Sequence, residues 1–181
     1  MGAGRKRTRA RSTPHRRRKQ FDRPTALHVG FHTVGGVCNL RKQRPFNVVK
    51  HALQRSAKRF RTRIIHFAVL SNHVHLIVES YDTRSLSRAM KGLCVCLAKR
   101  LNQLMGRHGQ VIEDRHFTRI IHSHRAAAKV MRYVRENHRK HTGPPGAWKT
   151  GVTIDPRSSW AHVILLLGPI TKLLRSADPF S

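Results

Sequence analysis

The chain has 181 residues, a length that fits one domain with flanking tails. It carries 37 Lys and Arg against 8 Asp and Glu, so its formal net charge is +29, which indicates a polyanionic partner: nucleic acid first, and an anionic membrane surface second. Three cysteines do not make a disulfide framework. No stretch approaches the roughly 20 apolar residues of a membrane span, and the N-terminus lacks the apolar stretch of a signal peptide. We therefore expect a reducing, cytoplasmic location with nucleoid association and no membrane partner.

The first half of the chain predicts a disordered tail followed by a strand, a helix and a second strand. Residues 1–22 are basic with almost no apolar content, which is typical of a disordered arm that contacts nucleic acid without specificity. Residues 26–34 alternate apolar and polar side chains, as a strand does. Residues 46–59 carry apolar side chains at helical spacing, and residues 63–70 are rich in β-branched side chains.

A tight turn at Ser71 and Asn72 then leads into a third strand over residues 74–79, antiparallel to the second. Residues 85–105 are expected to form a long helix with one apolar side. Ser85 is its expected N-cap, and Gly106 is expected to end it.

The last predicted core elements are a fourth strand over residues 111–121 and a helix over residues 123–138. The order predicts an α+β, ferredoxin-like βαββαβ sandwich: a four-stranded antiparallel sheet with two helices on one face, and the final helix leaning on the other. The expected organisation is the tail, a core domain over residues 23–142, and a C-terminal extension over residues 143–181 that is irregular with one short helix and covers some core.

Two histidines in the third strand are the first candidate site. His73 and His75 are two residues apart, so an extended strand presents both imidazoles on one face while Val74 and Leu76 face the opposite way. Neutral imidazole is the commonest protein metal ligand, so the pair indicates a divalent metal site. Partly buried histidines that serve only packing are the alternative.

The final helix supplies two further candidates. Tyr133 and Asn137 are four residues apart and share a helix face, from which both can reach a metal held by two histidines. They would then be a nucleophile and a third metal ligand. Spacing alone equally fits a half-buried aromatic residue and an ordinary asparagine near a helix end.

Two other groups favour structural interpretations. Glu113 and Asp114 are adjacent acids, for which an ion pair with a nearby arginine is expected ahead of a catalytic role. Four histidines match no strong ligand spacing, and phosphate contacts are expected for them ahead of a second metal cluster: His122, His124, His138 and His141.

The segment from Phe67 to Val78 resembles the histidine–hydrophobe–histidine strand of the single-tyrosine (HUH) DNA transposases, and in particular the REP-associated tyrosine transposase group, related to the IS200-like elements. The resemblance runs from about Leu27 to His141. It includes residues 100–102, residues 109–111 with Asp114 and Arg115, and the tyrosine helix at residues 133–137.

Three positions depart from the family pattern. Ser71 stands where the family usually has proline, His116 stands where relatives commonly have tyrosine, and His138 stands where proline often follows the asparagine. The tyrosine that is missing at position 116 is not the one taken as the nucleophile. These departures leave the four candidate catalytic residues in place.

The resemblance implies that His73, His75 and Asn137 bind Mg²⁺ or Mn²⁺, and that Tyr133 attacks the scissile phosphate of single-stranded DNA. The product is a covalent 5′-phosphotyrosine and a free 3′-hydroxyl. A hairpin substrate fits the family, and both a monomer and a homodimer with exchanged tyrosine helices remain open. The side chains expected to contact DNA are Arg59, Arg61, Lys99, Arg100, Arg115, Arg132, Arg135 and Arg139.

Two other functions remain as alternatives. One is a catalytically inactive hairpin DNA-binding protein of the same fold. The other is an RNA-binding ferredoxin-like domain, which is the weaker because such domains read bases with exposed sheet aromatics and this chain has few aromatic residues. Loss of cleavage in the presence of a chelator distinguishes the enzyme from both.

Overall fold

The computed structural model describes residues 19–113, 116–142, 155–159 and 174. Most of the predicted basic tail and of the predicted C-terminal extension therefore lies outside the described residues. Within the described part of the chain, no helix is both long enough and apolar enough to cross a membrane.

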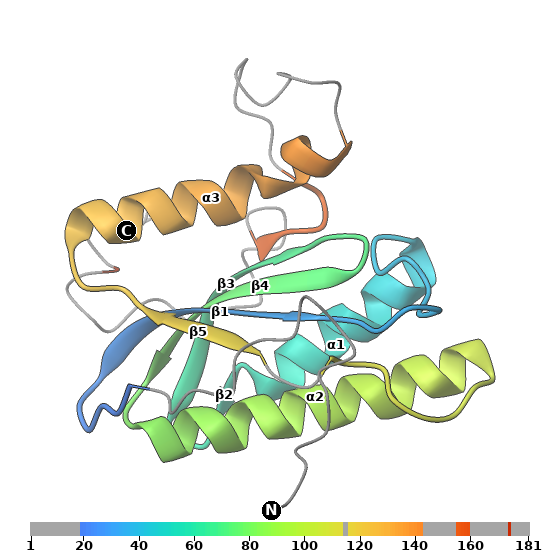
Figure 1. Cartoon of the computed structure of the whole chain (residues 1–181), viewed down its shortest axis with the longest axis horizontal. Coiled ribbons are helices and arrows are strands. Elements are labelled where there is room, and N and C mark those ends of the chain that lie inside the picture. The colour runs from blue at the N-terminus through green and yellow to red at the C-terminus, as the bar shows by residue number, and fades with distance from the viewer. Residues whose placement is uncertain (1–18, 114–115, 143–154, 160–173, 175–181) are drawn as a thin grey trace, which may run out of the picture.

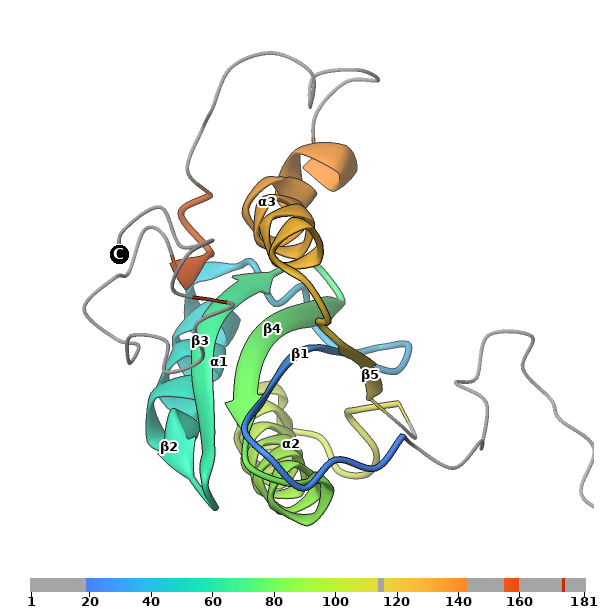
Figure 2. The same ribbon diagram turned by 90° about the vertical axis from the view of Figure 1, so that its left-hand side faces the viewer.

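The described core contains five strands and three helices. In chain order they are β1 (Thr25–His32), α1 (Gln43–Ser56), β2 (Lys58–Arg59), β3 (Thr62–Val69), β4 (His73–Ser80), α2 (Thr83–Met105), β5 (Phe117–Ile120) and α3 (His124–Thr142). The sheet order is β2-β3-β4-β1-β5 and every neighbouring pair is antiparallel. Apart from the two-residue β2, this is the predicted α+β sandwich, with α1 and α2 on one face and α3 on the other (Figures 1 and 2).

The alternation of side chains along β4 separates two cores. Val74, Leu76 and Val78 point toward α1 and α2, where they join a large apolar cluster. Ile77 points the other way and joins a second cluster beneath α3. Each fully buried aliphatic side chain of this kind contributes about 1.5–3 kcal/mol, so both faces of the sheet are stabilised by burial.

A stripe of apolar side chains holds α3 against the sheet. Ala127, Met131 and Val134 are spaced three or four residues apart, so they share one face of the helix, and all three are buried. They pack with Ile65 of β3 and with Ile77 of β4. The same contact places Tyr133 over the sheet.

The start of α2 differs from the prediction. Asp82, not Ser85, is the N-cap: its carboxylate accepts a hydrogen bond of 2.7 Å from the Ser85 backbone N–H and one of 2.9 Å from the Ser85 hydroxyl. These two bonds hold the pKa of Asp82 below its usual value. At the other end Gly106 adopts φ = 60°, a left-handed C-cap that glycine tolerates without strain, as predicted.

Two other boundaries also move. The predicted fourth strand is only the four residues of β5, because Val111 is buried in the α1–α2 core and Ile112 forms a separate bridge with Thr33. The predicted helix over residues 46–59 begins at Gln43 and ends at Ser56, where the chain enters β2. The helix begins earlier than predicted because its first two residues, Gln43 and Arg44, are polar and are not marked by the apolar spacing.

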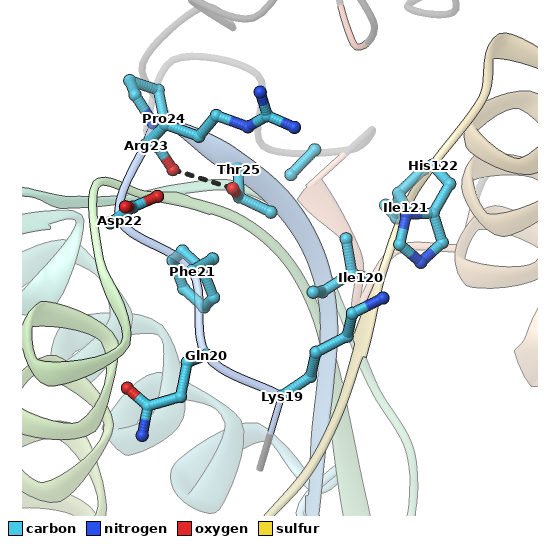
Figure 3. A pocket seen from close by; sticks show the side chains of 11 residues that line it. Lys19, Gln20, Phe21, Asp22, Arg23, Pro24, Thr25, Ile120, Ile121 and His122 are labelled. Atoms are coloured by element: carbon cyan, nitrogen blue, oxygen red, sulfur yellow. Dashed lines mark hydrogen bonds between the residues drawn. The ribbon is translucent and has the colours of Figure 1, made fainter.

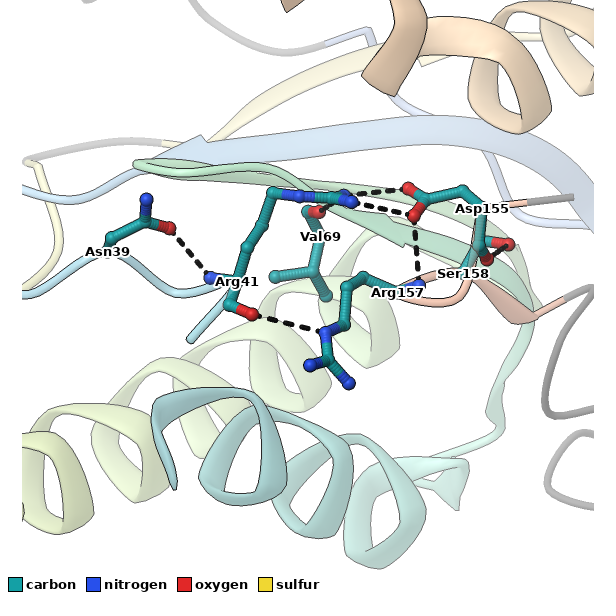
Figure 4. A network of polar contacts seen from close by, with 6 residues as sticks. All are labelled: Asn39, Arg41, Val69, Asp155, Arg157 and Ser158. Carbon is teal, nitrogen blue, oxygen red and sulfur yellow. Dashed lines mark hydrogen bonds and ion pairs between the residues drawn. The ribbon is translucent and has the colours of Figure 1, made fainter. Parts of the chain in front are cut away.

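A short C-terminal segment, residues 155–159, docks on the outer edge of β3 (Figure 4). Arg41 donates two hydrogen bonds of 2.8 and 2.9 Å to the buried carboxylate of Asp155. The backbone N–H of Val69 donates to the carbonyl of Arg157 at 3.0 Å, and the N–H of Phe67 donates to the Ser159 hydroxyl at 3.1 Å. The segment therefore closes part of the sheet edge, in agreement with the expectation that the extension covers some core.

Candidate active site

Four histidines from two adjacent strands gather on the α3 face of the sheet. His73 and His75 of β4 have ring centroids 5.0 Å apart. Across the β1–β4 ladder, His32 stacks on His73 at 4.6 Å and His28 lies 5.2 Å from His75. The alternation of β4 thus places the two predicted metal ligands side by side, as expected.

Tyr133 reaches this cluster from α3. Its hydroxyl lies 3.5 Å from Nε2 of His75, at the outer limit of hydrogen bonding. Its ring lies 5.2 Å from the His75 ring and 5.8 Å from the His28 ring. Phe117 of β5 completes the aromatic surround, with its ring edge-on to His28 at 5.0 Å. The structure therefore brings the predicted nucleophile and the predicted histidine pair together.

These side chains line a pocket of about 730 Å³ between the sheet and α3. Its wall combines imidazoles, a phenol, apolar side chains and two cations. The lining residues are His28, His32, His73, His75, Phe117, Arg119, Ile120, Ile121, Ala126, Lys129, Val130 and Tyr133.

Hydrogen bonds orient the histidine rings. Nδ1 of His73 donates to the side-chain oxygen of Asn72 at 2.9 Å, which puts the lone pair of this imidazole on Nε2. Nδ1 of His75 lies 3.2 Å from Nε2 of His28. Burial, and then the positive charge of Arg119, lower the pKa of His28 to about 4. His28 is therefore neutral at pH 7, and its hydrogen bond helps to fix the orientation of His75.

The two histidines fit part of a metal site. They are neutral nitrogen donors on one strand face, which suits a divalent transition metal better than Mg²⁺, an ion that favours oxygen. Among the residues that the structure describes, no three His, Cys, Asp or Glu side chains are grouped to hold a metal ion. Asn137 lies in α3 one turn beyond Tyr133, but its side chain is outside the described residues, so the third ligand stays a prediction.

The basic residues predicted to contact DNA are spread over several surfaces. Lys99 and Arg100 are exposed on α2, which covers the face of the sheet opposite the pocket (Figure 2). Arg59 and Arg61 are exposed at the β2–β3 hairpin. The structure does not bring these four side chains to the pocket.

The predicted arginines nearest to Tyr133 along the chain are on α3. Arg132 is exposed, and Arg135 is half-buried and pairs with Glu136 at 3.1 Å. Arg115 lies outside the described residues, and so does the side chain of Arg139.

Sequence reasoning missed several pocket residues. His28 and His32 lie at even positions of β1, between apolar residues at odd positions, so the alternation already placed them on one face. Arg119 follows the same alternation in β5. Lys129 lies four residues before Tyr133, on its side of α3.

The secondary predictions have mixed outcomes. His122 and His124 are exposed, whereas the side chains of His138 and His141 lie outside the described residues, as does Asp114. The three cysteines are free and half-buried, and burial raises the pKa of the Cys94 thiol to about 11, which agrees with a packing role.

Comparison with known proteins identifies the family. The sequence model described as "Transposase IS200 like" matches residues 31–137. The chain belongs to the IS200-like transposase family. The resemblance seen in its sequence is thereby confirmed, and the chain is a transposase by family. A search of curated protein sequences finds no match.

A solved structure agrees on the fold. The chain is similar to the REP-associated tyrosine transposase bound to a REP hairpin, with a TM-score of 0.61 and 14% identity, over 88% of this chain and 94% of that one. It also matches a Deinococcus radiodurans protein described as a transposase, with a TM-score of 0.47 and 15% identity, over 68% of this chain and 98% of that one. At these identities the first likeness shows the fold, and the second adds nothing to the argument.

Proposed function

We propose that this IS200-like transposase cleaves and rejoins single-stranded DNA through a covalent bond to Tyr133, with a divalent metal held by His73, His75 and Asn137. One observation carries the proposal: the Tyr133 hydroxyl lies 3.5 Å from His75, in a pocket that also contains His73. A phenol beside a histidine pair on a cationic surface suits nucleophilic attack on a phosphodiester.

The proposed reaction is a transesterification that balances without an outside energy source. The Tyr133 hydroxyl loses its proton as its oxygen forms a bond to phosphorus. The bond from phosphorus to the 3′ oxygen breaks, and that oxygen takes up one proton and leaves as a 3′-hydroxyl. Attack by another 3′-hydroxyl reverses the step and rejoins DNA. A bound Mn²⁺ or Mg²⁺ supplies Lewis-acid polarisation of the scissile phosphate.

The protein's own residues orient the reacting groups. Asn72 holds the His73 ring, and His28 holds the His75 ring through its Nδ1. Arg119 and Lys129 line the pocket and attract the phosphate. Nε2 of His75 cannot bind a metal ion and keep its hydrogen bond with the Tyr133 hydroxyl at the same time, so that contact belongs to the metal-free protein.

A DNA hairpin is the proposed substrate. The net charge of +29 favours a polyanion, and the similar REP-associated transposase was solved with a REP hairpin. Met131 and Val134 of α3 pack on the sheet of their own chain, which supports a site built within a single chain. We place the catalytic domain at residues 23–142.

The test is covalent capture on a denaturing gel. The intact chain is incubated with Mn²⁺ and a labelled hairpin matched to the DNA flanking its own coding sequence. The chain contains two tyrosines, so Tyr81→Phe is a matched control for Tyr133→Phe, because Tyr81 lies on the surface with 42% of its area exposed. A covalent band is expected for the wild type and for Tyr81→Phe, and is expected to vanish in Tyr133→Phe and in a chelator.

The same gel separates the alternatives. Retarded DNA on a native gel, with no covalent band under any metal condition, would leave a hairpin-binding protein and remove the catalytic proposal. A covalent band that survives Tyr133→Phe would move the nucleophile elsewhere. His73→Ala and His75→Ala are expected to lose the band and keep salt-sensitive DNA binding.

A further inference from the structure

A second pocket of about 470 Å³ lies where the chain enters β1 (Figure 3). The segment from Lys19 to Ala26 lines one side, and Ile120, Ile121 and His122 line the other. The entering segment is pinned: the Phe21 N–H donates to the Thr83 hydroxyl at 3.0 Å, and the Thr83 N–H donates to the Phe21 carbonyl at 3.2 Å. This wall is therefore held by the first turn of α2.

The second pocket adjoins the candidate active site at the end of β5. Ile120 and Ile121 line both pockets, although Ile120 packs toward the α1–α2 core and Ile121 packs beneath α3. Phe117 lines the active-site pocket three residues before Ile120 on the same strand, a separation of about 10 Å at about 3.4 Å per residue. About three stacked nucleotides, at about 3.4 Å each, cover that distance.

The charge along this path favours phosphate. Arg119 and Lys129 line the active-site pocket, and Lys19 and Arg23 line the second one, where Asp22 is the acidic lining residue. Within the described part of the chain, none of these four cations is in an ion pair. Their charge is therefore not neutralised by a neighbouring carboxylate.

We propose that the second pocket binds the unpaired DNA strand that flanks the scissile phosphate. The strand leaves the Tyr133 pocket past the end of β5, where Ile120 and Ile121 line both pockets, with Lys19 and Arg23 contacting its phosphates. A cationic groove with an aromatic side chain for base stacking holds single strands without base-specific hydrogen bonds, and Phe21 lines this pocket. This inference rests on the proposed DNA chemistry of Tyr133.

The test measures binding against flank length. Fluorescence anisotropy follows hairpins with an unpaired flank of two or of eight nucleotides, on either side of the stem, over a range of salt concentrations. Lys19→Ala/Arg23→Ala is expected to lower the slope of log K against log salt by about 1.4 on the long flank, since each single-strand phosphate contact contributes about 0.7. On the two-nucleotide flank no change is expected, because that strand ends before the second pocket.

Arg88→Ala/Lys91→Ala is the matched control, since it removes the same charge from exposed positions of α2 beyond its first turn, on the opposite face of the sheet. An equal slope change on short and long flanks, or the same change in the control, overturns the proposal. Photocrosslinking to the wild-type chain gives a second measurement, with 5-iodouracil placed in the flank. Crosslinks to residues 19–26 or 120–122 are expected, and crosslinks only elsewhere overturn the site.

The covalent gel keeps the two proposals apart. If Tyr133 forms no covalent band but the flank-dependent slope persists, the strand pocket stands and the chemistry falls. If the covalent band forms, but the difference in salt slope between the wild type and Lys19→Ala/Arg23→Ala is the same for short and long flanks, the chemistry stands and the strand pocket is wrong.

Discussion

Gly30 is the position where a single added methyl group tests the site most directly. It lies in β1 between His75 on one neighbouring strand and Phe117 on the other. A β carbon at Gly30 would lie 2.1 Å from Cε1 and 2.5 Å from Cζ of Phe117. Ordinary contact begins at 3.4 Å, so Gly30→Ala requires the ring to move by at least 1.3 Å, the difference between 3.4 and 2.1 Å.

The ring that must move also lines the candidate active site. Phe117 lies 5.0 Å from the His28 ring and 5.8 Å from the His75 ring. Overpacking of this kind costs about 1–3 kcal/mol, so we expect Gly30→Ala to lower the free energy of unfolding in urea by that amount. It is also expected to reduce formation of the covalent DNA complex.

Gly92→Ala is the matched control. A β carbon there would lie 3.8 Å from Cε2 of Phe60, which is ordinary contact, and alanine is favoured over glycine inside a helix by about 0.5–1 kcal/mol. This variant is therefore expected to be more stable than the wild type. The reasoning is refuted if Gly30→Ala is as stable as the wild type. It is also refuted if Gly30→Ala destabilises the Phe117→Ala variant as much as it destabilises the wild type, because the ring would then not be what requires glycine at this position.

Three further predictions concern other parts of the core. Arg41→Ala is expected to lower the free energy of unfolding in urea by about 2–3 kcal/mol. Breaking a fully buried pair would cost more, but here the Arg41 side chain is 19% exposed and that of Asp155 is 1% exposed. An unchanged urea midpoint would contradict this prediction. In the metal-free protein, the pKa of His28 is about 4, against 6.5 for an ordinary histidine. Between these two pH values the unfolded chain binds a proton at His28 that the folded chain does not. The free energy of unfolding is therefore expected to fall by about 3 kcal/mol as pH falls from 6.5 to 4. The groups facing His28 are His75, Arg119 and Tyr133, and His28→Asn should flatten this dependence; equal slopes in both proteins would count against it. Iodoacetamide at pH 8 is expected to label Cys94 far more slowly in the native chain than in the unfolded chain. A pKa of about 11 leaves only about one Cys94 thiol in a thousand as the reactive thiolate at this pH. Fast labelling of the native chain, followed by mass spectrometry, would refute this prediction.

The parts of the fold that follow a single period were predictable from sequence. The two-residue alternation around His73 and His75 separates a histidine face from an apolar face, and the structure has that separation. The helical spacing of Met131 and Val134 indicates a helix with one packed face, and α3 has it. Such patterns are local, so no knowledge of the partner segment is needed.

The parts that depend on distant partners were not predictable. Arg41 pairs with Asp155, 114 residues away, and neither neighbourhood carries a repeating pattern that indicates the other. His28 belongs to the site because β1 lies beside β4, a fact of sheet order that its own sequence does not contain. The length of β5 was overestimated for the same reason, since pairing and not hydrophobicity decides where a strand ends.

The docked segment at residues 155–159 has a consequence for solubility. An open strand edge offers unpaired N–H and C=O groups to a second chain, and it is a common route to aggregation. Here β2 pairs with the first residues of β3, and the C-terminal segment accepts hydrogen bonds from Phe67 and Val69 near its end. A chain truncated before Asp155 would expose those two N–H groups. The distal segment thus covers part of the edge at which the described core would otherwise pair with a second chain, a task separate from any contact with DNA.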